Sequence, residues 1–338
     1  MVWSILAGEL VGETEGARAL RAQIRQVAEN NDATVLVTGE SGTGKELTAR
    51  AIHNFSARRD FPFVDISCAS LPANLLESEL FGFERGAFTD AGARKRGYFE
   101  MAEGGTLFLD EIAEMSTSLQ AKLLRVLEQR TVRHLGGTED LPVDVRVIAA
   151  TNQDIHALMQ EGKFRSDLFY RLNVVPIHLV PLRDRAGDIP LLLEHYRLRL
   201  NTLLSRNCTG FSEDAMAALC RYYWPGTVRE LKNLLERILI LYNPVVIELA
   251  HLAQETLSPP AAAAPFHLTL PPEGLSLAPF LASVEDELVR LAMERTAGNV
   301  TQAAKLLNVP RETLRYKLSR VLPGGGKTGT NPPGPDTP

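Results

Sequence analysis

The sequence has few cysteines and lacks long apolar segments. Only Cys68, Cys208 and Cys220 occur among 338 residues, far apart and without paired Cys/His spacing, so neither a disulfide framework nor a zinc site is expected. No apolar run approaches the roughly 20 residues that cross a bilayer. The start, MVWSILAGEL, lacks the basic residues of a secretory signal. We therefore expect a cytoplasmic protein with no membrane contact.

The sequence also lacks the positive charge that would coat nucleic acid. Its formal net charge is -5 and its pI is about 5.9, so any DNA binding has to be confined to a local basic surface. With 45% hydrophobic and 23% charged residues, the chain is long and apolar enough for a large core and at least one further small domain.

Short apolar runs alternate with polar, helix-like stretches between Thr34 and His178: TVLVTG, FVDI, GTLFLD, VRVIAA and VVPIHL. This alternation predicts an α/β fold in which helices sandwich a parallel sheet. From Asp188 to about Tyr242 the pattern is helical only, as in IPLLLEHYRLRL and VRELKNLLERILIL. That periodicity predicts a helical subdomain packed beside the sheet.

A Pro- and Ala-rich segment between Ser258 and Pro279 has no sustained period and is expected to be a linker. A helical block follows from Ser283 to Arg320, and the tail PGGGKTGTNPPGPDTP has too little to bury and is expected to be disordered. The predicted parts are an α/β subdomain (1–181), a helical subdomain (182–250), a linker (251–279), a small all-α domain (280–322) and a tail (323–338).

The segment GESGTGKE follows the apolar run TVLVT and opens a helix near Lys45, which is the context of a phosphate-binding loop. Its glycines let backbone N–H groups turn toward a phosphate, the helix N-terminus adds its dipole, and Lys45 adds a positive charge. Glu46 departs from the pattern, because Ser or Thr normally holds magnesium there. A Gly-rich turn without a ligand is the alternative. The candidate nucleotide-binding residues are Gly39, Glu40, Ser41, Gly42, Thr43, Gly44, Lys45 and Glu46.

The segment GGTLFLDE places Asp110 and Glu111 at the end of an apolar strand. We expect Asp110 to hold Mg²⁺ through water and Glu111 to orient or deprotonate the attacking water. An acidic pair at the end of a buried strand is costly without a ligand or partner. A helix N-cap is the alternative, and it accounts for Asp110 better than for Glu111. The two motifs together predict an ATPase that uses ATP and Mg²⁺.

Five segments occur in the order GESGTGKE, ESELFGFERGAFTDA, GGTLFLDE, FRSDLFYRL and WPGTVRELKN. The order and the sequences of these segments resemble the AAA+ central domain of sigma-54-dependent transcription activators. The resemblance covers nearly the whole of the chain from Leu10 to Tyr242. The GAFT segment is specific, because other AAA+ machines do not carry it. The resemblance implies an AAA+ P-loop NTPase fold whose helical subdomain is the lid.

In that family the loop that bears GAFTGA touches sigma-54. The resemblance therefore assigns this contact to Gly86, Ala87, Phe88 and Thr89. An ordinary turn with a half-buried Phe is the alternative. Asp90 stands where the family usually has Gly, which affects the expected coupling.

Three arginines are assigned by the same resemblance. Arg165 and Arg171 of FRSDLFYRL match arginine fingers that act in trans on the γ-phosphate of the neighbouring subunit. Arg229 of WPGTVRELKN matches the lid arginine that senses nucleotide within its own subunit. Ordinary surface ion pairs are the alternative for all three.

Two further positions are read from the family's pattern. In AATN, Thr151 and Asn152 resemble the first sensor, and a strand-end cap is the alternative. In FVDISC, Ser67 occupies the place of an Asn that restrains the catalytic glutamate. Ser also hydrogen-bonds carboxylates but reaches less far, so this switch is expected to be looser here.

The block from Ser283 to Arg320 is predicted to form a helix that Gly298 ends, then a short helix in TQAAKLLN and a last helix in RETLRYKLSR. This is helix-turn-helix architecture and resembles the Fis-type domain of the same activators. With Leu314 and Leu318 facing inward, the candidate DNA-binding residues are Arg311, Thr313, Arg315 and Lys317. A solvated basic face is the alternative.

The sequence therefore predicts a sigma-54-dependent activator that binds upstream double-stranded DNA, forms a ring, expected to be a hexamer, and hydrolyses ATP to remodel the sigma-54 RNA polymerase holoenzyme from closed to open complex. No receiver or ligand-sensing segment precedes Leu10, so regulation is expected from a separate protein or from a domain outside this sequence. A DNA-binding regulator with a weakened or vestigial ATPase is one alternative. A chaperone-like AAA+ unfoldase is another, and the GAFT loop and helix-turn-helix disfavour it.

Overall fold

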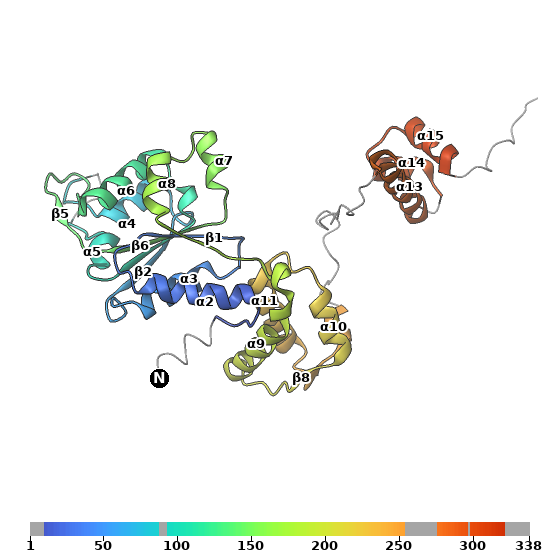
Figure 1. Ribbon diagram of the computed structural model, residues 1–338, viewed down its shortest axis with the longest axis horizontal. Helices are drawn as coiled ribbons and strands as arrows, with labels where there is room; N and C mark the ends of the chain where they lie inside the picture. The colour runs from blue at the N-terminus through green and yellow to red at the C-terminus, as the bar shows by residue number, and fades with distance from the viewer. Residues whose placement is uncertain (1–9, 88–92, 254–275, 297, 322–338) are drawn as a thin grey trace, which may run out of the picture. The chain divides into compact units, whose positions relative to one another are not determined.

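The computed structural model describes residues 10–87, 93–253, 276–296 and 298–321, which fall into two compact units that divide at Ala263 (Figure 1). Phe88, Thr89 and Asp90, most of the predicted linker and the predicted tail lie outside the described residues. No helix within the described ranges is long and apolar enough to span a bilayer.

A five-stranded parallel sheet forms the centre of the larger unit, in the order β2–β3–β6–β1–β7. Its strands are β1 (Val35–Thr38), β2 (Phe63–Ser67), β3 (Thr106–Asp110), β6 (Arg146–Thr151) and β7 (Val175–His178). The registers Thr38↔Thr151 and Ser67↔Asp110 bring the carboxyl ends of four strands to one edge. This confirms the predicted α/β fold, and that edge is where open α/β sheets bind ligands.

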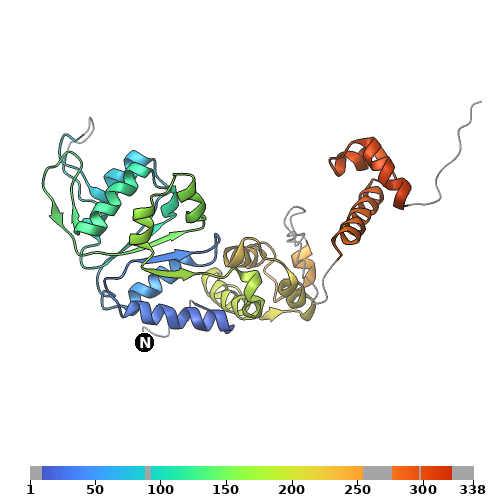
Figure 2. The ribbon, with the colours of Figure 1, turned by 45° about the horizontal axis from the view of Figure 1, so that its top comes forward.

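Side-chain alternation along the strands determines which helices cover which face. Leu107 and Leu109 of β3 pack on one face with α4 (Ala73–Phe81), α6 (Thr117–Gln129) and α8 (Ser166–Leu172). Phe108, between them, packs on the other face with α2 (Glu15–Ala28) and α3 (Lys45–Phe55). Because successive strand residues point to opposite faces, the run TLFLD fills both cores and the sheet is covered on both sides (Figure 2).

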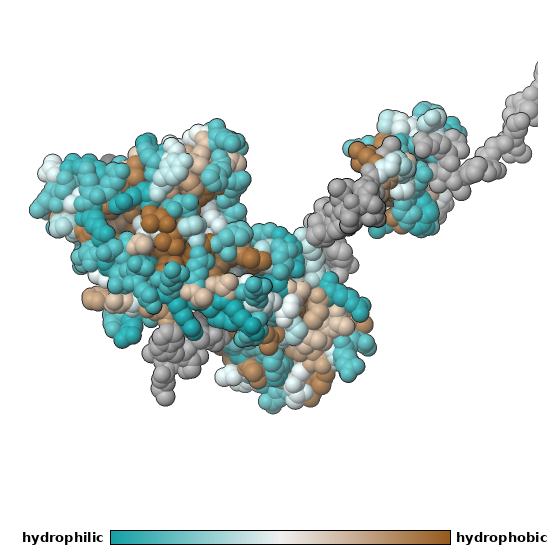
Figure 3. All heavy atoms as spheres, in the orientation of Figure 1, coloured by the Kyte–Doolittle hydropathy of each residue, from teal (hydrophilic) through white to brown (hydrophobic). Residues whose placement is uncertain are grey.

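Shorter elements complete this subdomain. They are α5 (Tyr98–Met101), the 3₁₀ helix η1 (Ile112–Glu114), the antiparallel pair β4 (Thr131–Val132) and β5 (Leu141–Pro142), and α7 (Ile155–Gln160). Figure 3 shows mainly hydrophilic residues on the visible surface of the larger unit, with apolar residues gathered in a few patches.

A helical subdomain follows the sheet in the same unit. It comprises η2 (Leu182–Asp188), α9 (Ile189–Leu204), α10 (Glu213–Arg221), α11 (Thr227–Leu241) and α12 (Leu249–Ala253). Its core surrounds Trp224, which is fully buried and donates Nε1–H to the Leu219 carbonyl at 2.9 Å. The prediction that this region is helical only was wrong in one detail. Two short strands, β8 (Gly210–Phe211) and β9 (Val246–Ile247), pair in parallel between its helices.

The smaller unit is a three-helix domain of α13 (Leu277–Arg295), α14 (Val300–Leu306) and α15 (Arg311–Val321). Leu314 is fully buried against Val289, Ala292, Ala303 and Ala304. The first helix begins six residues before the predicted Ser283, within the predicted linker. Pro279 lies in its first turn, where a missing N–H removes no intrahelical hydrogen bond.

Candidate nucleotide-binding and catalytic site

The predicted phosphate loop connects the end of β1 to the start of α3. Gly42 and Gly44 have φ values of +80° and +103°, a backbone region that glycine adopts without strain. A Cβ on Gly42 would lie 2.5 Å from Thr227 Oγ1. The glycine is therefore required both by the turn and by the close approach of the lid.

Lys45 is buried at the start of α3, and its Nζ donates to the carbonyls of Gly39 at 2.9 Å and Glu40 at 3.1 Å. Burial lowers the pKa of Lys45 from its usual range, and the nearby Asp110 and Glu111 carboxylates oppose that shift. The ammonium thus lies within the loop, between its carbonyls and the acidic pair.

The acidic pair lies at the carboxyl end of β3. Asp110 Oδ1 accepts the Glu111 backbone N–H at 3.0 Å, and burial raises the pKa of Asp110 although that hydrogen bond and Lys45 oppose the change. Within the described part of the chain, Asp110 Oδ2 has no hydrogen-bond donor. A half-buried carboxylate with a free oxygen fits a cation or its bound water better than an N-cap.

Glu111 has left-handed backbone angles, φ +54° and ψ +45°. Such angles cost a non-glycine residue of order 1 kcal/mol or more and are frequent at functional sites. Ser67 Oγ lies 3.5 Å from Glu111 Oε2, at the outer limit of a hydrogen bond. This distance agrees with the shorter reach expected of Ser at this position.

Glu46 forms an ion pair with Arg50 at 2.9 Å, one helical turn later. Arg50 in turn pairs with Asp65 of β2. A carboxylate already paired in this way replaces the hydroxyl that usually meets the metal, so Asp110 is the remaining candidate on these two motifs.

The end of β6 lies between the phosphate loop and the acidic pair. Gly39 N–H donates to the Thr151 carbonyl at 3.3 Å, which ties the loop to this strand. Thr151 is buried and its Oγ1 accepts the Gln153 N–H at 3.0 Å, as in a strand-end cap. Asn152 is exposed at the same edge, so Asn152 is the better placed of the two to reach a ligand.

The two predicted finger arginines do not join this group. Arg165 pairs with Asp167, with Nη2 to Oδ2 at 2.6 Å and Nε to Oδ1 at 3.0 Å. Arg171 Nη2 donates to the Leu127 carbonyl at 2.7 Å, and its own carbonyl accepts Thr34 Oγ1–H at 2.8 Å. Thr34 precedes β1 whereas the phosphate loop follows it. Four strand residues span ~13 Å, so Arg171 lies at the opposite edge of the sheet.

The lid approaches the phosphate loop through the start of α11. Arg229 Nη1 donates to Ser41 Oγ at 3.1 Å, and Thr227 Oγ1 donates to the Ser41 carbonyl at 3.0 Å. Thr227 itself has φ +59°, a conformation held by these contacts. The predicted lid arginine is therefore adjacent to the phosphate loop of its own chain.

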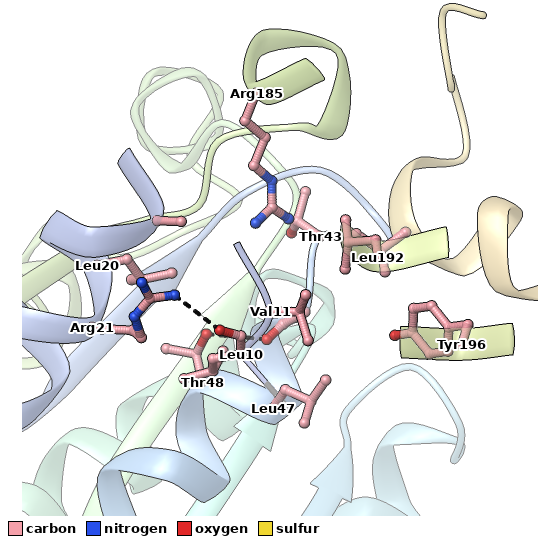
Figure 4. Close-up of a pocket in the computed structure, with 13 residues that line it drawn as sticks. Leu10, Val11, Leu20, Arg21, Thr43, Leu47, Thr48, Arg185, Leu192 and Tyr196 are labelled. Atoms are coloured by element: carbon pink, nitrogen blue, oxygen red, sulfur yellow. Dashed lines mark hydrogen bonds between the residues drawn. The ribbon is translucent and has the colours of Figure 1, made fainter. Parts of the chain in front are cut away.

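A cavity that sequence reasoning missed lies beside the loop (Figure 4). It has a volume of about 40 Å³ and adjoins a second cavity of about 290 Å³, with which it shares Ala17, Leu20, Thr43 and Arg185. Among the described residues, Arg185 Nε is buried without a hydrogen-bond partner. The lining is Leu10, Val11, Ala17, Leu20, Arg21, Thr43, Gly44, Leu47, Thr48, Arg185, Leu192, Tyr196 and Val228. This mixture of apolar walls and few polar groups is typical of a small-molecule site.

The segment before α2 closes this cavity and is held by Asp188. Asp188 is fully buried and accepts the N–H groups of Glu13 at 2.7 Å and Thr14 at 2.9 Å, and the Thr14 hydroxyl at 2.8 Å. A Cβ on Gly12 would lie 2.7 Å from Asp188 Oδ2. The signal for this segment in the sequence was Gly12, which follows the apolar pair Leu10 and Val11. The residue that it meets, Asp188, lies far along the chain.

The predicted sigma-54 contact belongs to the larger unit and the predicted DNA contacts belong to the smaller one. Gly86 has φ +83° and Ala87 packs against Gly136; both are at the start of the predicted sigma-54 loop. In the helix-turn-helix unit, Arg311, Thr313 and Arg315 are exposed. Lys317 instead is half-buried and pairs with Glu285 of α13, so it also stabilises its own domain.

Three family models match the chain. They are the Sigma-54 interaction domain over residues 10–178, the AAA+ ATPase lid domain over 183–266, and the Bacterial regulatory protein, Fis family, over 280–320. The lid match extends past residue 250, into the predicted linker.

Similar proteins cover most of the chain. The transcriptional regulatory protein ZraR of Klebsiella oxytoca is 46% identical over 311 residues, which are 92% of this chain and 68% of that protein. The regulatory protein AtoC of Escherichia coli is 45% identical over 288 residues, 85% of this chain and 62% of that protein. A crystal structure of NtrX from Brucella abortus in complex with ATP is 36% identical, with a TM-score of 0.65, over 92% of this chain and 68% of that one.

Fold, motifs and relatives agree. The larger unit is an AAA+ P-loop NTPase with a lid, it binds nucleotide, and the smaller unit is a Fis-type helix-turn-helix domain. The chain belongs to the family of sigma-54-dependent transcription activators and is an ATPase of that family.

Proposed function

We propose that the chain assembles into a ring, of six subunits, whose ATP sites form between neighbours and whose hydrolysis remodels the sigma-54 RNA polymerase holoenzyme from closed to open complex. The helix-turn-helix unit holds the ring at upstream double-stranded DNA. Because its proposed partners are the RNA polymerase holoenzyme and DNA, we expect the protein to act in the cytoplasm. The position of Arg171 carries this proposal, because its contacts with Thr34 and Leu127 place it at the sheet edge opposite its own phosphate loop.

Each subunit supplies the binding half of a site. The loop amides and Lys45 bind the phosphates, and the two adjoining cavities that share Thr43 together take the base. Arg229, already bonded to Ser41, senses the nucleotide from the lid. Mg²⁺, held through water by Asp110, would neutralise charge on the phosphates.

The catalytic half combines residues of two subunits. Glu111 orients the attacking water and accepts its proton, while Ser67 restrains the Glu111 carboxylate. Asn152 contacts the phosphate from the end of β6. Arg165 and Arg171 enter the neighbour's site and stabilise the charge that develops on the γ-phosphate.

We assign the sigma-54 contact to Gly86, Ala87, Phe88 and Thr89, which lie between the phosphate loop and the acidic pair in the sequence and have no titratable side chain. Arg311, Thr313 and Arg315 contact DNA, and Lys317 does so only if it leaves Glu285. We assign no base or phosphate to a particular side chain.

Transcription in vitro from a sigma-54 promoter, with ATP, without ATP, and with Thr89→Ala protein, tests this function. Thr89→Ala is expected to keep ATP turnover within a few-fold of wild type and to abolish open-complex formation. Open complexes at the wild-type level with that variant would contradict the sigma-54 assignment while leaving the ATPase intact. Asp90→Gly is the matched variant and is expected to preserve or increase activation, because it restores the residue that the family usually has at this position.

A DNA-binding regulator with a weakened ATPase is the second candidate. The Glu46–Arg50 pair and the 3.5 Å separation of Ser67 from Glu111 favour it. Steady-state turnover of the wild-type protein separates the two, since a weakened ATPase would differ little from its own Lys45→Ala variant.

A further inference from the structure

Glu40 introduces a negative charge into a loop that binds anions. It is the second residue of the phosphate loop and its side chain is 46% exposed. Hydrogen bonding to Arg183 lowers the pKa of Glu40, so the carboxylate stays ionised at neutral pH. An uncompensated carboxylate at this place would repel a nucleotide triphosphate, so the loop needs a cation beyond Lys45.

Arg183 supplies that cation in a two-point contact. Its Nη1 donates to Glu40 Oε2 at 2.6 Å, and its Nη2 donates to Oε1. Planar guanidinium and carboxylate groups paired in this way fix orientation as well as charge. Arg183 lies in η2, the segment that joins the sheet subdomain to the lid.

The same guanidinium also contacts the lid. Arg183 Cζ lies 5.3 Å from the centre of the Tyr223 ring, within the range of a cation–π interaction. Tyr223 precedes the buried Trp224 and the turn that carries Thr227 and Arg229 to Ser41. Arg183 therefore touches the phosphate loop on one side and the base of the Arg229 turn on the other.

We propose that Arg183 is a positioning residue for nucleotide binding, which neutralises Glu40 and fixes the phosphate loop against the lid turn. The inference rests on the ATP site proposed above and assigns a role that none of the residues named there performs. Arg183 acts through Glu40 and Tyr223 and does not touch the reacting atoms.

Binding of a fluorescent ATP analogue to the full-length chain, together with steady-state turnover, tests the proposal. Arg183→Gln is expected to weaken binding about tenfold, since Glu40 then loses its partner. It is expected to raise KM while kcat stays within a few-fold. Higher salt should reduce the difference, because the Glu40 charge is exposed and is screened.

A double variant distinguishes loss of the Glu40–Arg183 ion pair from general damage to the fold. Glu40→Gln with Arg183→Gln removes the unpaired charge and is expected to bind more tightly than Arg183→Gln alone. Glu40→Gln alone loses the contact that fixes the loop and is expected to bind a few-fold more weakly than wild type. Arg133→Gln is the matched control, because Arg133 makes an equally two-pronged contact with Asp140, at 2.9 and 2.8 Å, outside the nucleotide site. Its affinity should equal that of wild type.

Two results would overturn the inference: wild-type affinity in Arg183→Gln, or a double variant that binds as weakly as the single one. A thermal unfolding midpoint for each variant identifies loss through unfolding, and Glu40→Gln tests the loop contact even if Arg183→Gln fails to fold, because wild-type affinity in Glu40→Gln would show that the contact is not needed. Lys45→Ala tests the ATP site itself. If Lys45→Ala binds the analogue like wild type, the site proposal fails, whatever the Arg183 series shows.

Discussion

The two edges of the central sheet differ in what they offer a nucleotide. At the carboxyl edge, Lys45, Asp110 and Glu111 lie beside the phosphate loop, and Arg229 reaches it from the lid. At the opposite edge, Arg171 is held between Thr34 and the carbonyl of Leu127. One edge carries the groups that bind a nucleotide, whereas the other holds an arginine far from its own phosphate loop, which we propose acts on a neighbouring subunit. Binding and catalysis are thus expected to depend differently on assembly.

The largest effect on turnover is expected from Arg171→Ala. It is expected to lower turnover ~10³-fold, as loss of an arginine finger does, and to leave nucleotide affinity of the isolated subunit unchanged. Measured at several protein concentrations, wild-type turnover per subunit should rise as subunits associate.

Mixing provides the control for that prediction. Arg171→Ala and Lys45→Ala proteins, each inactive alone, should recover part of the activity together, since some interfaces then carry neither defect. Turnover that is independent of dilution, in demonstrably monomeric wild-type samples, would show that no trans residue is needed.

A change at the carboxyl edge removes the proposed base instead of the finger. Glu111→Gln should retain ATP binding and lose turnover by about two orders of magnitude or more, in keeping with the contribution of a general base. Glu114→Gln is the matched control: Glu114 lies three residues later, in η1, and bonds to the Gln153 side chain. Near-normal hydrolysis by Glu111→Gln would exclude the assignment of Glu111 as the base.

Thr34→Val is a smaller change at the sheet edge that carries Arg171. It removes the hydrogen bond to the Arg171 carbonyl, which is worth about 1 kcal/mol. We expect a few-fold lower turnover and unchanged nucleotide affinity. Calorimetric binding of ADP checks the second point. If Thr34→Val instead loses nucleotide affinity and keeps its turnover, the assignment of Arg171 to the catalytic half of the site would be wrong.

The smallest effect on turnover is expected from the separate DNA-binding unit. Arg311→Ala with Arg315→Ala should leave ATP hydrolysis unchanged and weaken binding to upstream DNA strongly, because both side chains are exposed on α15. Footprinting at fixed salt measures the loss. An unchanged footprint would show that this face of the helix is only solvated.

Motifs with strong local patterns could be predicted without a structure. The five strands were predicted because buried parallel strands are continuous apolar runs, and the start of α3 at Lys45 because the glycine pattern precedes it. The short pair β8 and β9 was missed, since strands of two residues have no period to detect. The start of α13 was misplaced because Pro279 was taken as a linker residue rather than part of a first turn.

The family, the order of its motifs and the chemistry that each motif can perform follow from residues close together in the chain. Which distant groups meet depends on how whole elements pack. Asp188 holds Glu13 and Thr14, Arg183 neutralises Glu40, and Lys317 is paired with Glu285 rather than free. A charged side chain has many equivalent partners in a sequence, and packing selects among them only when the elements that carry them are brought together.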